Sequence, residues 1–306
     1  MAKEATRAAY GKALAELVQE NENVVVLDAD LAGSTKTAEA KKVCPERHFD
    51  MGIAEGNMMA VAAGMAASHK IPYASAFAVF ATGRAYDQIR NSICYPNLNV
   101  KVCATHAGLT VGEDGASHQS LEDIALMRAL PNMKVFQPCD GVEARAIVKA
   151  VADIDGPCYV RLGRLAVDTV NDPDTYKYEF GKGIVMKKGA KVAIIATGMM
   201  VQEALKAAEQ LDFDPTVINI NTIKPIDKDL IIETAKTHDA IVTVEEHNVI
   251  GGLGGAVAEV LADQKERCPQ YMMGVKDEFG QSGTPAALLD AYGLDAAHIA
   301  EFIQKL

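Results

Sequence analysis

The sequence has little positive charge for its length. Its 306 residues carry 30 Lys and Arg against 41 Asp and Glu, which gives a formal net charge of −11. Nucleic acids and anionic membrane surfaces bind basic faces, so this balance argues against both as partners. A small phosphorylated ligand needs only a few local Arg and His side chains and is compatible with the composition.

Paired cysteines and long apolar runs are also missing. The six cysteines are scattered, and no two form a Cys-x-x-Cys pair. This pattern indicates buried thiols in a reducing compartment rather than a disulfide framework or a zinc site. The longest apolar run, residues 58–67, is too short to span a bilayer, and the polar start Met-Ala-Lys-Glu-Ala-Thr-Arg does not read as a signal peptide. We therefore expect a cytoplasmic protein with no membrane partner.

Apolar runs and helical patterns alternate along the first half of the sequence. Residues 3–20 have apolar positions at helical spacing, and residues 24–27 form a continuous apolar run. Further strands are expected at 71–77, 100–104, 134–137 and 159–162, and further helices after Glu55 and at 84–90, 121–129 and 141–152. Strands that alternate with helices predict a doubly wound α/β domain with a largely parallel sheet.

The same pattern restarts after a break, which predicts two doubly wound α/β domains. Residues 166–184 lose the periodicity and gain Asp, Pro and Gly, so we expect a linker between a first domain at 1–165 and a second at 185–306. Strands are then expected at 191–196, 216–220, 240–245 and 271–275, with helices at 201–210, 227–236 and 255–261. Thr284 and Asp295 are expected to cap the last two helices.

The glycine-rich run at 251–255 could indicate a dinucleotide site. Val257 stands where the third small residue of that motif belongs, and no expected strand directly abuts the run. Close packing of a helix on the sheet is therefore the favoured interpretation.

Polar and aromatic residues follow the expected strands of the first domain. In a parallel sheet, ligands bind outside the carboxyl ends of the strands, so these residues should share one edge although they are far apart in the sequence. They are Asp30 and Ser34 after the first strand, Glu55 near a short second strand, Phe77 and Phe80 after the third, His106 after the fourth and Arg164 after the last.

Glu55 is a single carboxylate between a short apolar strand and a helix of Met, Ala, Val and Gly. Few nearby polar groups could solvate its anion, and an apolar setting favours the protonated carboxyl, which suits proton sharing with a ligand. A structural alternative is equally open, because a negative charge in the first turn of a helix is favoured by the helix dipole.

Two histidines and an acidic pair lie on a loop at residues 105–120 that also contains glycines. A lone histidine is more often a satisfied core or surface group than a catalyst. Here His106 and His118 flank Asp114 on one loop, and a long loop in a compact domain is typical of a functional site.

Three motifs together resemble the pyrimidine-binding half of a transketolase, and the resemblance extends over essentially the whole chain. They are Gly52-Ile53-Ala54-Glu55, Ala76-Phe77-Ala78-Val79-Phe80, and Thr105-His106-Ala107-Gly108 with Gly112-Glu113-Asp114-Gly115-Ala116-Ser117-His118-Gln119. The resemblance implies a thiamine-diphosphate-binding domain followed by a transketolase C-terminal domain, for which the family suggests an assembly or regulatory role.

The resemblance also implies roles for individual residues. Those expected at the cofactor are Glu55, Phe77, Phe80, Asp30 and Gln88. Those expected at the sugar substrates and the acceptor phosphate are Arg7, Ser34, His106, Asp114, His118 and Arg164. Glu55, His106 and His118 are expected to act in catalysis. Phe77 and Phe80 could also be plain core aromatics, and Arg7 could be a solvated helix residue.

The sequence departs from the family at two positions of the aromatic wall. Ala76 replaces the usual Thr, and Gly83 stands where a larger residue is expected. Tyr86 or Gln88 could rebuild part of that wall.

The sequence contains no Gly-Asp-Gly, the motif that in thiamine enzymes holds Mg²⁺ and the cofactor diphosphate together with a later Asn. We therefore expect no metal ligand in this chain. The resemblance implies the C-terminal subunit of a split, two-chain enzyme, whose N-terminal partner supplies the Mg²⁺ ligands in an α2β2 heterotetramer.

The implied reaction is transfer of a two-carbon ketol unit from a ketose phosphate to an aldose phosphate, as in the pentose phosphate pathway. The corresponding half of a deoxyxylulose-phosphate synthase and the β subunit of a 2-oxo-acid dehydrogenase are alternatives, although Thr105-His106 and the Gly-Glu-Asp-Gly loop depart from what those enzymes are expected to carry. A non-catalytic regulatory partner would not require Glu55, His106, Asp114, His118 and Arg164 together.

Overall fold

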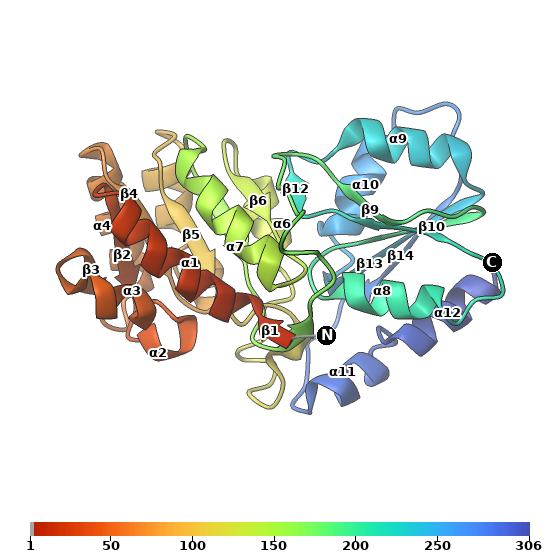
Figure 1. Cartoon of the computed structure of the whole chain (residues 1–306), viewed down its shortest axis with the longest axis horizontal. Helices are drawn as coiled ribbons and strands as arrows, with labels where there is room; N and C mark the ends of the chain where they lie inside the picture. The colour runs from red at the N-terminus through yellow and green to blue at the C-terminus, as the bar shows by residue number, and fades with distance from the viewer. Residues whose placement is uncertain (1–2) are drawn as a thin grey trace.

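The computed structural model describes residues 3–306, which form two α/β lobes joined side by side (Figure 1). The first lobe contains a seven-stranded sheet of order β12-β6-β7-β5-β4-β2-β3, and the second contains a five-stranded sheet of order β14-β13-β10-β11-β9. Most neighbouring strands are parallel, and β12 and β9 pair antiparallel with their neighbours. The predicted α/β class with largely parallel sheets is confirmed.

Helices cover both faces of the first sheet because its strands are apolar on both sides. In β2 the side chains of Val24 and Val26 pack with α1 and α7, whereas Val25 and Leu27 pack with α4. A strand buried on both faces requires helices above and below it. The strands are β2 (Val24–Asp28), β3 (His48–Asp50), β4 (Ile71–Ser75), β5 (Lys101–Ala104), β6 (Lys134–Phe136), β7 (Cys158–Arg161) and β12 (Thr222–Lys224). The helices are α1 (Thr6–Glu20), α2 (Ala32–Thr35), α3 (Ala38–Val43), α4 (Glu55–Ala67), α5 (Tyr86–Gln88), α6 (Asp123–Ala129) and α7 (Gly141–Ala150).

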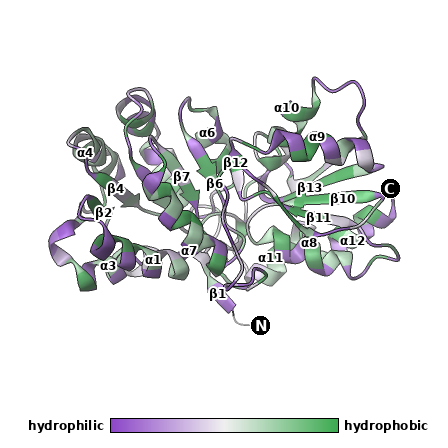
Figure 2. Cartoon of the chain, turned by 45° about the horizontal axis from the view of Figure 1, so that its top comes forward, coloured by the Kyte–Doolittle hydropathy of each residue, from purple (hydrophilic) through white to green (hydrophobic). Residues whose placement is uncertain are grey.

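The second lobe repeats this architecture around a smaller sheet. Figure 2 shows its strands in green, as hydrophobic, with purple, hydrophilic residues on the helices around them. Its strands are β9 (Ile184–Lys187), β10 (Val192–Ala196), β11 (Thr216–Asn219), β13 (Ala240–Asn248) and β14 (Gln270–Val275). Its helices are α8 (Met200–Ala208), α9 (Lys228–Thr237), α10 (Leu253–Leu261), α11 (Pro285–Ala291) and α12 (Ala296–Gln304). Both predicted N-caps are confirmed, since Thr284 accepts from the Ala287 amide and Asp295 from the His298 amide.

The first helix begins later than its apolar spacing predicts. Residues Lys3–Ala5 form β1, which pairs antiparallel with β8 (Ala166–Asp168). α1 then begins at Thr6, whose hydroxyl accepts a hydrogen bond from the Gly163 amide. The prediction of a helix from residue 3 was therefore wrong, because these residues pair with a strand more than 160 positions away, which local periodicity cannot reveal.

One strand crosses between the lobes. β12 follows β11 of the second lobe in sequence but pairs with β6, so it completes the edge of the first sheet (Figure 1). Sequence periodicity predicted no strand at these three residues. The crossing fixes the two lobes to each other through backbone hydrogen bonds.

The segment that was predicted as a regular helix at 84–90 is more irregular. α5 is short and lies between two π-helical segments, Phe80–Arg84 and Ile89–Cys94. Wide turns of this kind are frequent at functional sites.

All six cysteines are free and buried, as their spacing predicts. Among residues 3–306, no helix combines the length and the apolarity that crossing a bilayer requires.

Candidate active site

The candidate residues of the first lobe gather at one edge of its sheet. The adjacent strands β3, β2, β4, β5 and β7 run parallel and end at this edge. Glu55, Ser34, Phe77, His106 and Arg164 follow these strands, as the carboxyl-end rule predicts. Two of the first-lobe candidates, Asp30 and Asp114, have exposed side chains.

Two aromatic rings and two imidazoles form one stack at this edge. The rings of Phe77 and Phe80 lie 5.8 Å apart, centroid to centroid, and are nearly parallel at 19°. His106 stacks on Phe77 at 3.8 Å, and His118 contacts Phe80 edge-on at 5.3 Å. The 105–120 loop therefore folds back onto the segment that follows β4 and brings both histidines to the phenylalanine pair.

Glu55 begins α4 and is only 4% exposed. Its Oε1 lies 3.1 Å from Nη1 of Arg84, a side chain that is 53% exposed. The Arg84 guanidinium also lies over the Phe80 ring, 4.1 Å from its centroid. The expectation that Glu55 has few polar neighbours was therefore wrong. Arg84 is 29 positions away in sequence, and only the turn after β4 brings it to Glu55.

Gln88 borders the first turn of α4. A Cβ on Gly56 would lie 3.3 Å from Gln88 Oε1, so the amide of Gln88 packs directly beside the residue that follows Glu55. Tyr86 instead packs against the apolar core. Of the two residues that could compensate for Gly83, Gln88 is the one that lies beside Glu55.

The guanidinium groups of Arg7 and Arg164 are near enough to interact electrostatically with each other and with His106. Arg7 donates from Nη1 to the Ser34 carbonyl at 2.7 Å, while its buried Nε has no hydrogen-bond partner. Burial, and then the charge of Arg164, lower the pKa of Arg7. Arg164 donates to the Val111 carbonyl and lies 3.6 Å from the Asp114 carboxylate. Adjacent cations with an unused buried donor are what an anion site provides.

Three further candidate residues lie beside these groups. Ser34 meets Arg7 through its backbone carbonyl, and Asp114 pairs with Arg164. Asp30 lies at the same edge with φ of +61°, its amide donating to Asp50.

His106 is held neutral and in a strained conformation. Burial, followed by the charges of Arg7 and Arg164, lowers its pKa to about 3. Its φ of +58° is unusual for a residue with a side chain, and its Nδ1 shares a 2.9 Å hydrogen bond with the Thr105 hydroxyl. Strained residues of this kind cluster at functional sites. The neutral ring can offer a hydrogen bond but no positive charge.

Sequence reasoning missed two groups near this edge. Lys36 adds to the positive charge that lowers the His106 pKa. Asp28, fully buried at the end of β2, accepts from the Thr35 and Thr37 hydroxyls and so fixes the turn that carries Ser34. A charged residue at the end of an apolar run was the available signal for Asp28.

The glycine run of the second lobe has its helix N-terminus already occupied. β13 runs to Asn248, closer to Gly251 than the sequence indicated. Both oxygens of Glu245 accept from the first amides of α10, Leu253 at 2.6 Å and Gly254 at 2.8 Å. These amides are the ones that a dinucleotide phosphate would need. The structure therefore favours the helix-packing interpretation.

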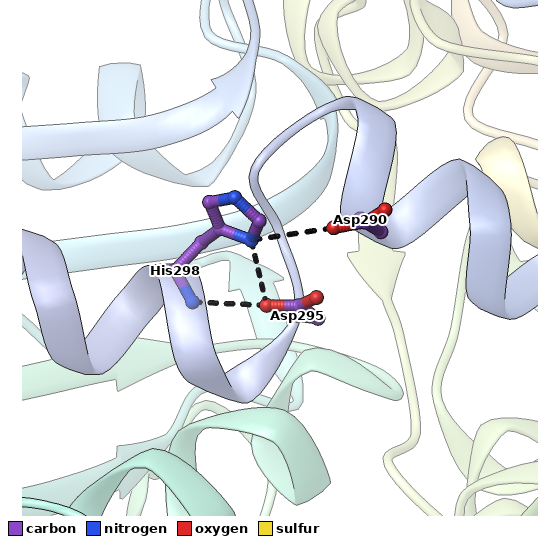
Figure 3. A group of neighbouring side chains, drawn as sticks. All are labelled: Asp290, Asp295 and His298. Atoms are coloured by element: carbon purple, nitrogen blue, oxygen red, sulfur yellow. Dashed lines mark hydrogen bonds and ion pairs between the residues drawn. The ribbon is translucent and has the colours of Figure 1, made fainter.

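One cluster at the junction of α11 and α12 resembles a cation site in composition. Asp290, Asp295 and His298 lie together, with His298 Nδ1 2.9 Å from Asp295 (Figure 3). Asp295 is the N-cap of α12, so its carboxylate already accepts from the His298 amide. We interpret the cluster as a helix cap.

Comparison with known proteins agrees with this architecture. The sequence matches the transketolase pyrimidine-binding domain over residues 2–169 and the transketolase C-terminal domain over residues 181–299. It is 48% identical over 303 residues to a putative transketolase C-terminal section of Methanocaldococcus jannaschii, covering 98% of this chain and 95% of that protein.

Two further matches are described in different terms, one as an inactive assembly and one as a subunit that acts on a sulfosugar. A solved structure described as a split gene transketolase, inactive β4 tetramer, is 55% identical, superposes with a TM-score of 0.91, and matches 98% of this chain and 97% of its own. A 6-deoxy-6-sulfo-D-fructose transketolase subunit of Clostridium sp. (strain MSTE9) is 39% identical over 96% of this chain and 91% of its own. The chain therefore belongs to the transketolase family, and it carries the pyrimidine-binding and C-terminal domains that make up the C-terminal section of a split transketolase.

Proposed function

We propose that the chain is one subunit of a thiamine-diphosphate-dependent transketolase that transfers a two-carbon ketol unit from a ketose phosphate to an aldose phosphate. The observation that carries this proposal is the single sheet edge that holds a buried Glu55 at a helix start, the Phe77 and Phe80 pair, and the two guanidinium groups of Arg7 and Arg164. One part suits a planar heterocycle, and the other suits a phosphate.

The residues fit the pyrimidine end of the cofactor. The Phe80 ring, with the nearly parallel Phe77 ring beside it, offers an apolar face, and stacking of aromatic groups contributes about 0.5–1.5 kcal/mol per pair beyond area burial. The Phe80 face is covered by Arg84, whose half-exposed side chain can turn outward. The carboxylate of Glu55 then lies where a ring nitrogen of the heterocycle can share its proton.

When bound, thiamine diphosphate supplies the nucleophilic carbon and the electron sink for the ketol transfer. Glu55 holds the proton at the pyrimidine ring. His118, edge-on to Phe80, can bond or exchange a proton with a substrate hydroxyl above that ring, and neutral His106 can donate a hydrogen bond. The Asp114 carboxylate pairs with Arg164 and helps to orient it.

The proposal includes a partner. Because the sequence has no Gly-Asp-Gly, we propose that Mg²⁺ and the cofactor diphosphate are held by an N-terminal transketolase subunit in an α2β2 assembly. The free buried thiols support a reducing, cytoplasmic location. We further propose the domain division 1–165 and 185–306 with a connecting segment at 166–184, although that segment includes the short strand β8.

The partner requirement can be tested with the purified chain. Alone, it should bind thiamine diphosphate weakly in calorimetry and give no turnover, because the diphosphate and its metal would have no protein ligands. Addition of the N-terminal subunit should restore both. Tight Mg²⁺-dependent binding by the chain alone would contradict the split-subunit proposal.

The phosphate assignment is tested by Arg164→Ala in the assembled enzyme. Charge-assisted hydrogen bonds contribute about 1.5–3 kcal/mol each, so KM for ribose 5-phosphate should rise about tenfold to a hundredfold. Because the phosphate lies away from the reacting carbons, the unphosphorylated acceptor glycolaldehyde should be little affected.

A matched control is Arg145→Ala, which removes an arginine that pairs with Glu16 between α7 and α1. It should leave both acceptors unchanged. If Arg164→Ala impairs both acceptors equally, Arg164 supports structure rather than phosphate. Turnover of pyruvate with glyceraldehyde 3-phosphate, and none of ketose phosphates, would instead favour a deoxyxylulose-phosphate synthase activity.

A further inference from the structure

The second lobe holds the loop that carries both histidines. The side-chain amide of Gln119 donates to the Gln281 carbonyl at 3.0 Å, and the backbone amide of Asn248 donates to the Leu121 carbonyl at 2.8 Å. The loop thus lies between the sheet edge of the first lobe and two segments of the second, the end of β13 and residues 279–285. Its conformation depends on both lobes.

Glu246 of β13 makes the most direct of these contacts. Its side chain is 3% exposed, and its Oε2 accepts two hydrogen bonds from Thr110, from the amide at 3.2 Å and the hydroxyl at 2.8 Å. The loop backbone is pressed against this carboxylate at Gly108. A Cβ there would lie 2.3 Å from Glu246 Cδ, and the φ of +82° also requires glycine.

The contact continues to the guanidinium that we assign to phosphate. Thr110 belongs to a 3-10 helix of one turn, Leu109–Val111. The carbonyl of Val111, the next residue, accepts from Arg164. Fixing Thr110 therefore fixes the acceptor that orients the Arg164 side chain.

A buried ion pair also contacts the backbone of Glu246. Arg161 pairs with Asp123 at 2.7 Å, and its Nη2 also donates to the Glu246 carbonyl at 3.3 Å and the Ser120 carbonyl at 3.1 Å. The same guanidinium thus joins the strand that carries Glu246 to the end of the histidine loop.

We propose that Glu246 is a positioning residue of the active site, which sets the place of Arg164 through Thr110 and Val111. The second lobe thereby contributes to substrate binding without touching the substrate. The part of this proposal that concerns phosphate rests on the function proposed above for Arg164.

The neighbouring glutamate offers a matched control. Glu245 is equally buried, at 1% exposed, and its carboxylate also accepts two hydrogen bonds from backbone amides, at the start of α10. Truncation of either residue removes a buried carboxylate and leaves two donors unpaired. Only Glu246 contacts the histidine loop.

The first experiment measures amide hydrogen exchange of the isolated chain. Glu246→Ala should speed exchange at residues 108–120 by about tenfold or more, the change expected from losing two hydrogen bonds. Glu245→Ala should speed exchange at α10 and leave that loop unchanged. Equal protection of the loop in Glu246→Ala and wild type would overturn the proposal.

The second experiment measures steady-state kinetics with the partner subunit. Glu246→Ala should raise KM for ribose 5-phosphate by about tenfold with a smaller effect for glycolaldehyde, whereas Glu245→Ala should change neither. Glu246→Gln should restore most of the wild-type value, because an amide oxygen can still accept from Thr110. Faster loop exchange without any kinetic change would mean that Glu246 has only a structural role, and the proposal would fail.

Failure of the phosphate assignment and failure of the positioning role give different results. If Arg164→Ala itself affects both acceptors equally, the phosphate assignment fails. Glu246→Ala must then still lower kcat/KM for both acceptors, unlike Glu245→Ala, for the positioning role to stand. If Glu246→Ala does not fold, Thr110→Val removes only the hydroxyl bond and should shift KM for ribose 5-phosphate in the same direction by several-fold. No shift in Thr110→Val would overturn the proposal.

Discussion

Replacing Glu55 with Gln separates a proton-sharing role from a structural one. The substitution keeps the shape of the side chain but removes its charge and its ability to share a proton. Glu55 is 4% exposed at the start of α4, where it pairs with Arg84. If the carboxyl serves only the helix dipole and the ion pair, the loss of charge should matter little for turnover.

The two roles predict effects of different size. Arg84 is 53% exposed, so the solvent screens the ion pair, which contributes about 0.2–1 kcal/mol to stability. A positioned acid–base group contributes about 10²- to 10⁴-fold to the rate, which corresponds to about 3–5 kcal/mol in the transition state. The effect on activity should therefore exceed the effect on stability several-fold.

The assay compares Glu55→Gln with Arg84→Gln in the complex with the partner subunit. Arg84→Gln breaks the same ion pair but leaves the carboxyl in place. We expect turnover to fall at least about 10²-fold in Glu55→Gln and to stay near wild type in Arg84→Gln, with urea unfolding of both chains close to wild type. Equal losses in the two variants, or near-normal turnover of Glu55→Gln, would refute the proton-sharing role.

Three other outcomes are expected. Arg161→Met leaves the Asp123 carboxylate, which is 0% exposed, without its cation, and should lower the free energy of unfolding by about 3–5 kcal/mol in urea titrations. Burial and the neighbouring cations lower the pKa of His106 to about 3, against about 6.5 for histidine in an unfolded chain, so its ring should stay neutral in imidazole NMR spectra down to about pH 5, and the fold should lose stability increasingly as the pH falls below about 6.5. Asp295→Ala removes the N-cap of α12 and should cost about 0.5–2 kcal/mol, whereas a metal chelator should leave the melting temperature unchanged.

Local patterns were enough to predict most of the sheet and the edge where the candidate residues meet. The apolar run at β2 is buried on both faces, and β4, β5, β6 and β7 were predicted from similar runs. The carboxyl-end rule then brought Glu55, Phe77 and His106 to one edge without knowledge of any side-chain position.

Contacts made by a single residue across a long sequence separation were not predictable. β1 is a strand only because β8 lies beside it, and β12 is a strand only because β6 has a free edge. Arg84 reaches Glu55 through irregular π-helical turns whose direction no periodicity encodes. In each case both partners are present in the sequence, but no local pattern indicates that they meet.

The two lobes satisfy each other's buried polar groups, and this limits how they can move. Glu143 of the first lobe is fully buried and accepts from Asn219 at 3.0 Å and from Asn221 at 2.8 Å, both of which belong to the second. Gln202 of α8 donates to the Cys139 carbonyl at 2.7 Å.

Separating the lobes would exchange each of these hydrogen bonds for one to water, at a net cost of about 0.5–1.5 kcal/mol apiece, and would also break the β12–β6 pairing. A domain typically has only about 5–15 kcal/mol of total stability, so such an opening would cost a substantial part of it. The contacts between the lobes therefore favour one relative position, in which Glu246 presents its carboxylate to the histidine loop.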